Sequence, residues 1–291
     1  MLKKWIYLAC AAAPCITCQA ADNTPAPPAG KPANVPEPHT HLGQYLKMLH
    51  EHDVTFGPLG SWQKGEIEII VNPEQIKRIE NQTRLRLISK GVSEKTAENW
   101  SAVGIVAEDN YWMWIRDAVV FPSGVYGTYD RLMWKSGMDG APGVAVLAVL
   151  SNKKIVVNLA YRHATRSWEI ELPRGKKQQG ETLEQTALRE LKEETGYQLT
   201  KTELLGSCAP NSGVLMSVVP LFFGIASHSG ENQKEFSEAI FQNPAFSKQE
   251  LKDGFVKGYI EVPIKGQIVR VNCRDPFLTY AIVLAEGKGI I

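Results

Sequence analysis

The chain has 291 residues, which is enough for one large domain or two smaller ones with a packed core. Hydrophobic residues make up 44% of the chain and charged residues 22%, and the formal net charge is +1. This balance excludes a broadly basic nucleic-acid-binding protein and an acidic tail for a basic partner, so any polyanion must bind at a local site.

The first twenty residues are typical of an export signal. Two lysines precede the apolar run 5–13, which Pro14 ends before small residues that lead to Ala20. The run is too short for a permanent bilayer span. The sequence predicts a signal peptide over 1–20, cleaved after Ala20, no stable membrane span, and a periplasmic or secreted protein. An N-terminal anchor or a plain apolar tail is the alternative.

Cysteine usage gives no disulfide framework. Three of the five cysteines lie in the leader, and the predicted mature chain keeps only Cys208 and Cys273. One disulfide between these two residues and a pair of buried free thiols both fit the sequence.

A linker and a small helical region follow the leader. Residues 21–41 hold six prolines, which predicts an extended linker. The alternation over 66–71 predicts a strand, Asn72-Pro73 predicts the start of a helix that ends near Lys90, and 93–100 predicts another helix. We treat 42–102 as an N-terminal extension and assign no chemistry to it.

Strand signals dominate residues 103–291, which predicts a mixed α/β layered domain. Two hairpins are expected, over 111–121 with 125–134 and over 143–150 with 154–160. Further strands are expected at 168–172 and 214–226, and a last helix from Asp275-Pro276 to about Gly287.

The segment 175–197 predicts a helix with three carboxylates on one face. Thr182 and Gln185 form a capping-box pattern, and Gly196 suits the C-terminal cap. Three glutamates follow at i, i+3 and i+4: Glu190, Glu193 and Glu194. Like charges at this spacing oppose a helix, and a hard divalent cation would offset their repulsion. A solvated acidic surface is the alternative explanation.

The full spacing of 175–197 resembles the Nudix signature, G-x5-E-x7-R-E-U-x-E-E-x-G-U, where U is a bulky apolar residue. Every fixed position matches, and Tyr197 stands where an aliphatic residue is usual. The resemblance implies a Nudix fold, a mixed β-sheet sandwiched between helices, here preceded by the helix-strand extension. It also implies a magnesium-dependent hydrolase of a diphosphate bond.

Carried over to this sequence, the resemblance gives the box residues their roles. Glu190 and Glu194 would be the principal ligands of Mg²⁺, or of Mn²⁺, with Glu193 as an auxiliary ligand. The backbone carbonyl of Arg174 would also help to bind the metal. The other fixed residues would be structural or bracing: Arg189 pairing with Glu181, and the glycines Gly175 and Gly196.

Residues outside the box narrow the substrate. Tyr161-Arg162 and the run 171–175 resemble the "Y/F-R … E-L-P-x-G" pattern of ADP-ribose pyrophosphatases and nucleotide-sugar hydrolases. There the arginine contacts the substrate phosphates, which implies that role for Arg162, while Glu171 could be a structural brace. Aromatic residues of the 111–134 hairpin, Trp112 and Tyr129 above all, with Tyr111 and Trp114, are candidates for stacking on the base. Core packing, or a homodimer through this hairpin, is the alternative.

Two departures weaken the ADP-ribose assignment. Pro210 lies closer to the box than the proline of that group, and Ser217 stands where relatives often carry a carboxylate. Three glutamates of the later loop are candidates for a catalytic base, without an alignment that singles one out: Glu231, Glu235 and Glu238.

The sequence thus predicts hydrolysis of a nucleoside diphosphate linked to another moiety, favouring ADP-ribose or a nucleotide sugar. The products would be a nucleoside monophosphate and a sugar phosphate. A dinucleoside polyphosphate hydrolase and a non-catalytic nucleotide-binding module are the alternatives.

Overall fold

The computed structural model describes residues 42–138, 140, 142–232 and 239–291. The predicted signal peptide 1–20 and linker 21–41 lie outside the described residues, as do Glu235 and Glu238. No helix in the described ranges has both the length and the apolar character needed to cross a membrane.

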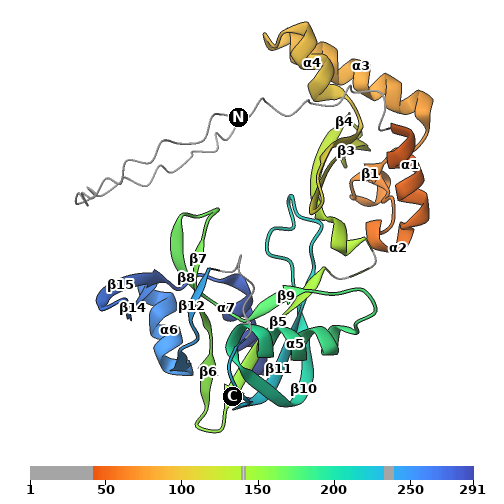
Figure 1. Ribbon diagram of the computed structural model, residues 1–291. Helices are drawn as coiled ribbons and strands as arrows, with labels where there is room; N and C mark the ends of the chain where they lie inside the picture. Colours follow the sequence, from red (N-terminus) through yellow and green to blue (C-terminus); the bar gives the residue numbers. More distant parts are fainter. Residues whose placement is uncertain (1–41, 139, 141, 233–238) are drawn as a thin grey trace. The chain divides into compact units, whose positions relative to one another are not determined.

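The N-terminal part of the described chain places helices around a small antiparallel sheet (Figure 1). Strand β3 (Trp112–Val120) pairs with β4 (Tyr126–Trp134) on one edge and with β2 (Gly104–Glu108) and β1 (Glu68–Ile69) on the other. The helices are α1 (Leu42–Glu51), α2 (Asp53–Phe56), α3 (Pro73–Ser89) and α4 (Glu94–Ser101), with short 3₁₀ turns at Trp62–Lys64 and Lys135–Gly137. Helices α1, α2 and α3 share one hydrophobic core with the sheet, and this core includes Tyr45, Ile76, Ile115 and Met133.

The predicted helices of this part are confirmed. The Asn72 side chain caps α3 by accepting from the backbone N–H groups of Glu74 and Gln75, and Ser93 caps α4. The strand expected at 66–71 is shorter, because only β1 reaches the end of β3 to pair with it.

The rest of the described chain forms two further sheets with three helices. One sheet is mixed and has the order β10-β11-β5-β6-β13, with β9 paired to β5; the other has the order β12-β7-β8-β15-β14. The strands of the first sheet are β5 (Gly143–Leu150), β6 (Lys154–Val156), β9 (Arg174–Lys176), β10 (Tyr197–Cys208), β11 (Val219–His228) and β13 (Ala245–Ser247). Those of the second are β7 (Asn158–Arg162), β8 (Ser167–Glu171), β12 (Ile240–Gln242), β14 (Tyr259–Ile264) and β15 (Gln267–Asn272). The helices are α5 (Leu183–Thr195), α6 (Lys248–Lys257) and α7 (Pro276–Gly287).

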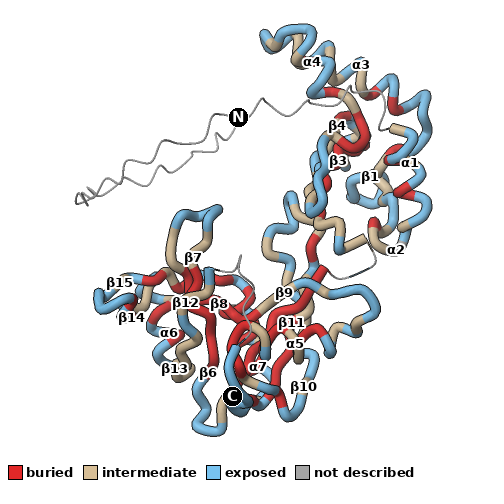
Figure 2. Tube along the Cα trace, in the orientation of Figure 1, coloured by how far each residue is buried: buried red, intermediate tan, exposed pale blue. Residues whose placement is uncertain are grey.

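Strand β5 explains how the first sheet is covered on both faces. Its even-numbered residues, Val144, Val146 and Ala148, share a core with Ala187 and Leu191 of α5. Its odd-numbered residues pack into a second core with the other sheet and α7. Because successive strand side chains point to opposite faces, a strand buried on both must be apolar throughout. Buried residues also run through parts of β6 and β11, at 155–156 and 221–224, and the tube of Figure 2 is red along these strands. The predicted mixed α/β layered fold is confirmed.

Two predicted strands are divided differently. The strand expected at 154–160 breaks at Val157, because β6 pairs with β5 in the first sheet and β7 pairs with β8 in the second. The strand expected at 214–226 begins only at Val219, because the preceding loop pairs with β4 instead. There Leu132 N–H donates to the Val214 carbonyl and Met216 N–H to the Leu132 carbonyl, both at 2.9 Å. Strand β10, helix α6 and the β14–β15 hairpin were not predicted.

Strands β1, β2 and β4 each pair with β3, and among the described residues none of these four strands pairs with a strand of the other two sheets. The domain boundary at 103 stays a prediction.

Both cysteines of the described chain, Cys208 and Cys273, are free thiols. Burial raises the pKa of the Cys273 thiol to about 12, and the nearby Asp275 and Glu169 charges act in the same direction. Of the two arrangements open to the sequence, the structure has the free thiols.

Candidate active site

Helix α5 gives the box its frame. At its start the Thr182 hydroxyl accepts from Gln185 N–H at 3.1 Å, while Thr182 N–H donates to the Gln185 side chain at 2.8 Å. At its end Gly196 adopts a left-handed conformation with φ of 74°, and its N–H returns to the Lys192 carbonyl. Both predicted caps are present, so local hydrogen bonds define where the helix begins and ends.

Two of the three box glutamates are buried against the sheet. Glu190 is 7% exposed and Glu194 is 3% exposed. A Cβ atom on Gly175 would lie 1.9 Å from the Glu190 carboxyl carbon, so only glycine leaves room for that carboxylate. The burial rules out the solvated acidic face that the glutamates alone left open.

Arg189 gathers the charges of the box. Its guanidinium donates to Glu181 through Nε at 2.6 Å and Nη2 at 3.0 Å, and through Nη1 to Glu190 at 2.8 Å and Glu193 at 2.9 Å. Nη2 also reaches the Lys176 carbonyl at 2.9 Å. The Arg189 guanidinium holds the pKa of the Glu181 carboxyl at about 2. The expected pair of Arg189 and Glu181 is therefore present, and the arginine offsets repulsion among the box carboxylates.

The Glu194 carboxylate is held by two donors on the same oxygen. Its Oε2 accepts from the Asn158 side chain at 2.8 Å and from the Arg174 backbone N–H at 2.9 Å. The side-chain oxygen Oδ1 of Asn158 in turn accepts from Nδ2 of Asn243 at 2.8 Å. Arg174 thus reaches this predicted metal ligand through its N–H, whereas its carbonyl was the group implied by the resemblance.

A row of alternating charges borders the box. Glu171 of β8 accepts from Arg162 through both carboxylate oxygens and from Arg174 at 3.1 Å. Arg174 also pairs with Asp275 at 3.0 Å and lies over the Phe277 ring. Burial raises the pKa of Asp275, while its pairing with Arg174 opposes that rise. Arg162, the predicted phosphate ligand, is therefore oriented by Glu171, with 41% of its side chain exposed.

The two preferred base-stacking residues are not brought together. Trp112 stacks on Trp134 with ring centroids 3.6 Å apart, at the end of the β3–β4 hairpin. Tyr129 lies farther along β4, and its hydroxyl donates to the Gly213 carbonyl at 2.8 Å. At the Trp134 end, the Lys176 ammonium lies over the Tyr111 ring at 4.5 Å and the Trp134 ring at 4.6 Å. Lys176 directly follows Gly175, so this end of the hairpin is the one beside the box.

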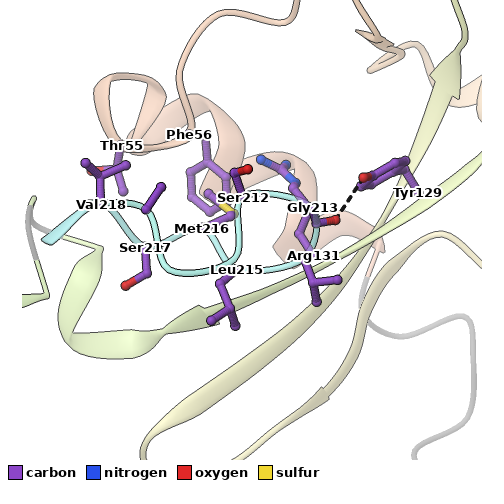
Figure 3. A pocket seen from close by; sticks show the side chains of 12 residues that line it. Thr55, Phe56, Tyr129, Arg131, Ser212, Gly213, Leu215, Met216, Ser217 and Val218 are labelled. Carbon is purple, nitrogen blue, oxygen red and sulfur yellow. Dashed lines mark hydrogen bonds between the residues drawn. The ribbon is translucent and has the colours of Figure 1, made fainter. Parts of the chain in front are cut away.

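A cavity of about 340 Å³ lies between β4 and the loop 209–218, lined by Phe56, Arg131 and Met216 among others (Figure 3). Its described lining includes no residue of 175–197. Arg131 is held at its edge by Asp117, which also accepts from the Tyr45 hydroxyl at 2.7 Å. Ser217, which the Nudix resemblance places at an often acidic position, is buried at this cavity.

Three site residues were missed by the sequence reading: Asn158, Asn243 and Lys176. Asn158 is a lone amide within the apolar run 154–160, and a buried polar residue in such a strand needs a partner. That signal was present in the sequence. No local sequence pattern marked Asn243 or Lys176.

Of the three glutamates predicted as candidates for a catalytic base, only Glu231 lies in the described residues, and it is exposed.

Comparison with known proteins finds a family model that matches the part of the chain containing the box. Residues 141–259 match the family model of the NUDIX domain. These residues contain the box with its buried glutamates. Residues 141–259 of the chain are therefore similar to the NUDIX domain.

Two curated relatives align over 101 residues. A "Methanol dehydrogenase activator" from Bacillus methanolicus is 38% identical, and an "ADP-ribose pyrophosphatase" from Bacillus subtilis (strain 168) is 37% identical. Each alignment covers 34% of this chain and 55% of the relative, so the chain spans about half the length of the curated relatives it matches. Among solved structures, an ADP compounds hydrolase superposes with a TM-score of 0.46 and 18% identity, over 65% of this chain and 94% of its own.

Proposed function

We propose that this protein is a Nudix pyrophosphohydrolase that cleaves a nucleoside diphosphate linked to another moiety. ADP-ribose or a nucleotide sugar is the favoured substrate, and a nucleoside monophosphate and a sugar phosphate are the products. The observation that carries the proposal is the pair of buried carboxylates, Glu190 and Glu194, on one face of α5 beside Gly175. The relative named ADP-ribose pyrophosphatase supports the substrate class.

The donor set fits a hard divalent cation, Mg²⁺ or Mn²⁺. Gly175 leaves its space to the Glu190 carboxylate, and carboxylate oxygens are the ligands such ions prefer. Within the described ranges no three His, Cys, Asp or Glu side chains are gathered closely enough to enclose an ion by themselves; magnesium commonly completes its shell with water and substrate phosphate oxygens. Glu190 and Glu194 would hold the ion, with Glu193 and the Arg174 carbonyl assisting. When bound, it supplies positive charge to the phosphate oxygens and makes a water molecule nucleophilic.

Residues around the proposed metal site position the carboxylates and bind the substrate. Arg189 fixes Glu190 and Glu193 relative to Glu181, so the carboxylates are in place before substrate arrives. Arg162, oriented by Glu171, donates to the diphosphate from the neighbouring sheet. The aromatic end of the β3–β4 hairpin, which contains Trp112, lies on the box side and receives the base; Tyr129 contacts the loop 209–218 instead.

Each alternative function predicts a different experimental result. A dinucleoside polyphosphate hydrolase would use the same carboxylates on a longer phosphate chain. A non-catalytic nucleotide-binding module has no need of Glu190, Glu193 and Glu194 together, and turnover with magnesium separates it from an enzyme. A homodimer through the 111–134 hairpin also stays a proposal, which sedimentation of the purified protein would test.

Replacing Glu194 by Gln tests the metal site. The substitution keeps the shape of the side chain and removes a charged ligand, so turnover of ADP-ribose should fall at least about a hundredfold. The protein should still fold, because the amide can accept from Asn158 and Arg174 as the carboxylate does. Glu184→Gln, on the exposed side of α5, is the matched control and should retain wild-type turnover. Near-wild-type turnover of Glu194→Gln at saturating magnesium would sink the assignment.

A substrate panel tests the proposed class. The specificity constant for ADP-ribose or a nucleotide sugar should exceed that for diadenosine polyphosphates at least about tenfold. Arg162→Lys loses the forked contact and should raise KM more than it lowers kcat, whereas Arg166→Lys in the exposed turn after β7 should change neither. A preference for dinucleoside polyphosphates would move the enzyme to the alternative class.

A further inference from the structure

Two asparagines lie where the strands change sheets. The chain passes from β6 in the first sheet to β7 in the second at Val157, and it passes back from β12 to β13 at Pro244. The two crossings are adjacent, because Val157 N–H donates to the Pro244 carbonyl at 3.0 Å. Asn158 and Asn243 are the next residues along, and their side chains bond to each other at 2.8 Å. The crossing therefore places a pair of side-chain amides next to Glu194 of α5.

The chemistry of the neighbours fixes the direction of the Asn158 amide. An ionised Glu194 carboxylate can only accept, so the Asn158 atom 2.8 Å from it must be the Nδ2 donor. That leaves Oδ1 for the Asn243 side chain, which donates through its own Nδ2. Asn158 is fully buried, and a buried amide that loses its partners carries a cost of about 1–3 kcal/mol. The hydrogen bonds thus run in one direction, from Asn243 through Asn158 to Glu194.

We propose that Asn158, itself oriented by Asn243, is a positioning residue for Glu194. Together with the Arg174 N–H it holds the same carboxylate oxygen, Oε2, and so fixes the plane in which Glu194 meets a divalent cation. Ligating carboxylates depend on such partners, whose loss costs about ten- to a hundredfold in metal affinity. The inference rests on the metal site of the proposed function and extends that site by two residues outside the box.

Titration of the full chain with Mn²⁺, followed by electron paramagnetic resonance without any nucleotide, tests it. Asn158→Leu keeps the size of the side chain and removes the donor, so the Mn²⁺ dissociation constant should rise about ten- to a hundredfold. Asn243→Leu should give a smaller rise, because it acts through Asn158. The double variant should bind Mn²⁺ no more weakly than Asn158→Leu alone. This lack of additivity is the readout that general loosening of the core would not produce.

Asn272→Leu is the matched control. Asn272 is another asparagine of the second sheet, where it donates to the Trp168 carbonyl at 3.1 Å beside Glu169. Its replacement should leave Mn²⁺ affinity unchanged. Wild-type Mn²⁺ affinity in Asn158→Leu, or in Asn243→Leu if the first variant does not fold, overturns the inference, as do fully additive losses.

The wild-type protein separates this inference from the proposed function. If it binds Mn²⁺ but turns over no nucleotide derivative, the proposed function fails while the asparagine variants still decide the inference. If it binds no Mn²⁺, both fail.

Discussion

Arg189 shows how much of the site is settled by one side chain. A hard cation was expected to offset the repulsion among the box glutamates, but the Arg189 guanidinium already bonds to Glu181, Glu190 and Glu193. A planar fork suits this position, because its donors reach several carboxylates at once. The box is therefore arranged by its own residues, and a metal would add to that arrangement.

The pair of Glu181 and Arg189 predicts a dependence of stability on pH. The pKa of Glu181 is about 2 in the folded protein, below its ordinary value of 4.5. A lowered carboxyl pKa stabilises the fold fully above the unfolded value, and the stabilisation is lost as pH falls towards the folded value. The difference in unfolding free energy between wild type and Glu181→Gln should therefore shrink from about pH 4.5 downwards.

Urea unfolding at a series of pH values between 5.5 and about 3 measures this difference. Glu184→Gln is the control, because Glu184 lies in the first turn of α5 and accepts from the Thr202 hydroxyl, with no hydrogen bond to Arg189. A difference between wild type and Glu181→Gln that stays constant over this range would contradict the prediction.

The residue contacts that could be predicted are those between residues close together in the sequence. Glu181, Arg189 and the box glutamates lie on one turn and one helix, so their spacing alone brings them together. Asn158 meets Glu194 across 36 residues of sequence, and that contact depends on which sheet β7 joins. No local pattern contains that information. The placement of Trp112 and Tyr129 at separate points of a hairpin likewise follows from register.

Among the elements, those with strong local signals were predicted and those without were not. Helix α5 has a capping box and a terminal glycine, and β5 is an unbroken apolar run. Strand β10 is an edge strand with two register shifts and only two buried residues, so it has no clean alternation. Helix α6 begins with a capping box of Ser247 and Glu250, a signal that was present and went unread.

Two glycines at the β5–β9 pairing should respond to alanine in opposite ways. In Gly175→Ala the three atoms nearest to the new Cβ all belong to the Glu190 carboxylate, which can turn away, so turnover should fall at least about tenfold while the fold survives. In Gly143→Ala the Cβ would lie 2.1 Å from the Gly175 backbone oxygen, which cannot move without separating the strands. That variant should lose about 1–3 kcal/mol of stability.

Thermal unfolding and initial rates, measured on both variants, check this contrast. Gly43→Ala, on an open face of α1, is the control and should leave activity unchanged. Equal stability losses at Gly175 and Gly143 would contradict it.

The described chain combines residues 141–259, which match the NUDIX domain, with a separate sheet of β1 to β4 that has its own core. The loop 209–218, which joins β10 to β11, forms backbone hydrogen bonds with β4. It therefore links the two parts by direct contact as well as through the chain. Sequence patterns could not reveal this, because the loop's apolar residues read equally well as the start of β11.

We propose that the protein is exported, with cleavage after Ala20 and a mature chain that begins at Ala21. The charged and apolar pattern of 1–20 motivates this proposal, and those residues lie outside the described part of the structure. An exported nucleotide hydrolase would act on external nucleotides and draw its metal from that environment. N-terminal sequencing of protein from the native host should give Ala21 first, and an intact Met1 on cytosolic material would refute export.

The buried Cys273 gives the molecule a native reporter of its own fluctuations. Its sulfur lies beneath α6, 4.0 Å from the Leu251 carbonyl, and its raised pKa suppresses the reactive thiolate. A thiol reagent can reach it only when the α6 layer opens, so the reaction rate measures the free energy of that local opening. The half-buried Cys208 on β10 provides a second, more accessible rate in the same sample. Local opening around α6 and β10 can thus be followed in the unlabelled protein, with and without metal or nucleotide.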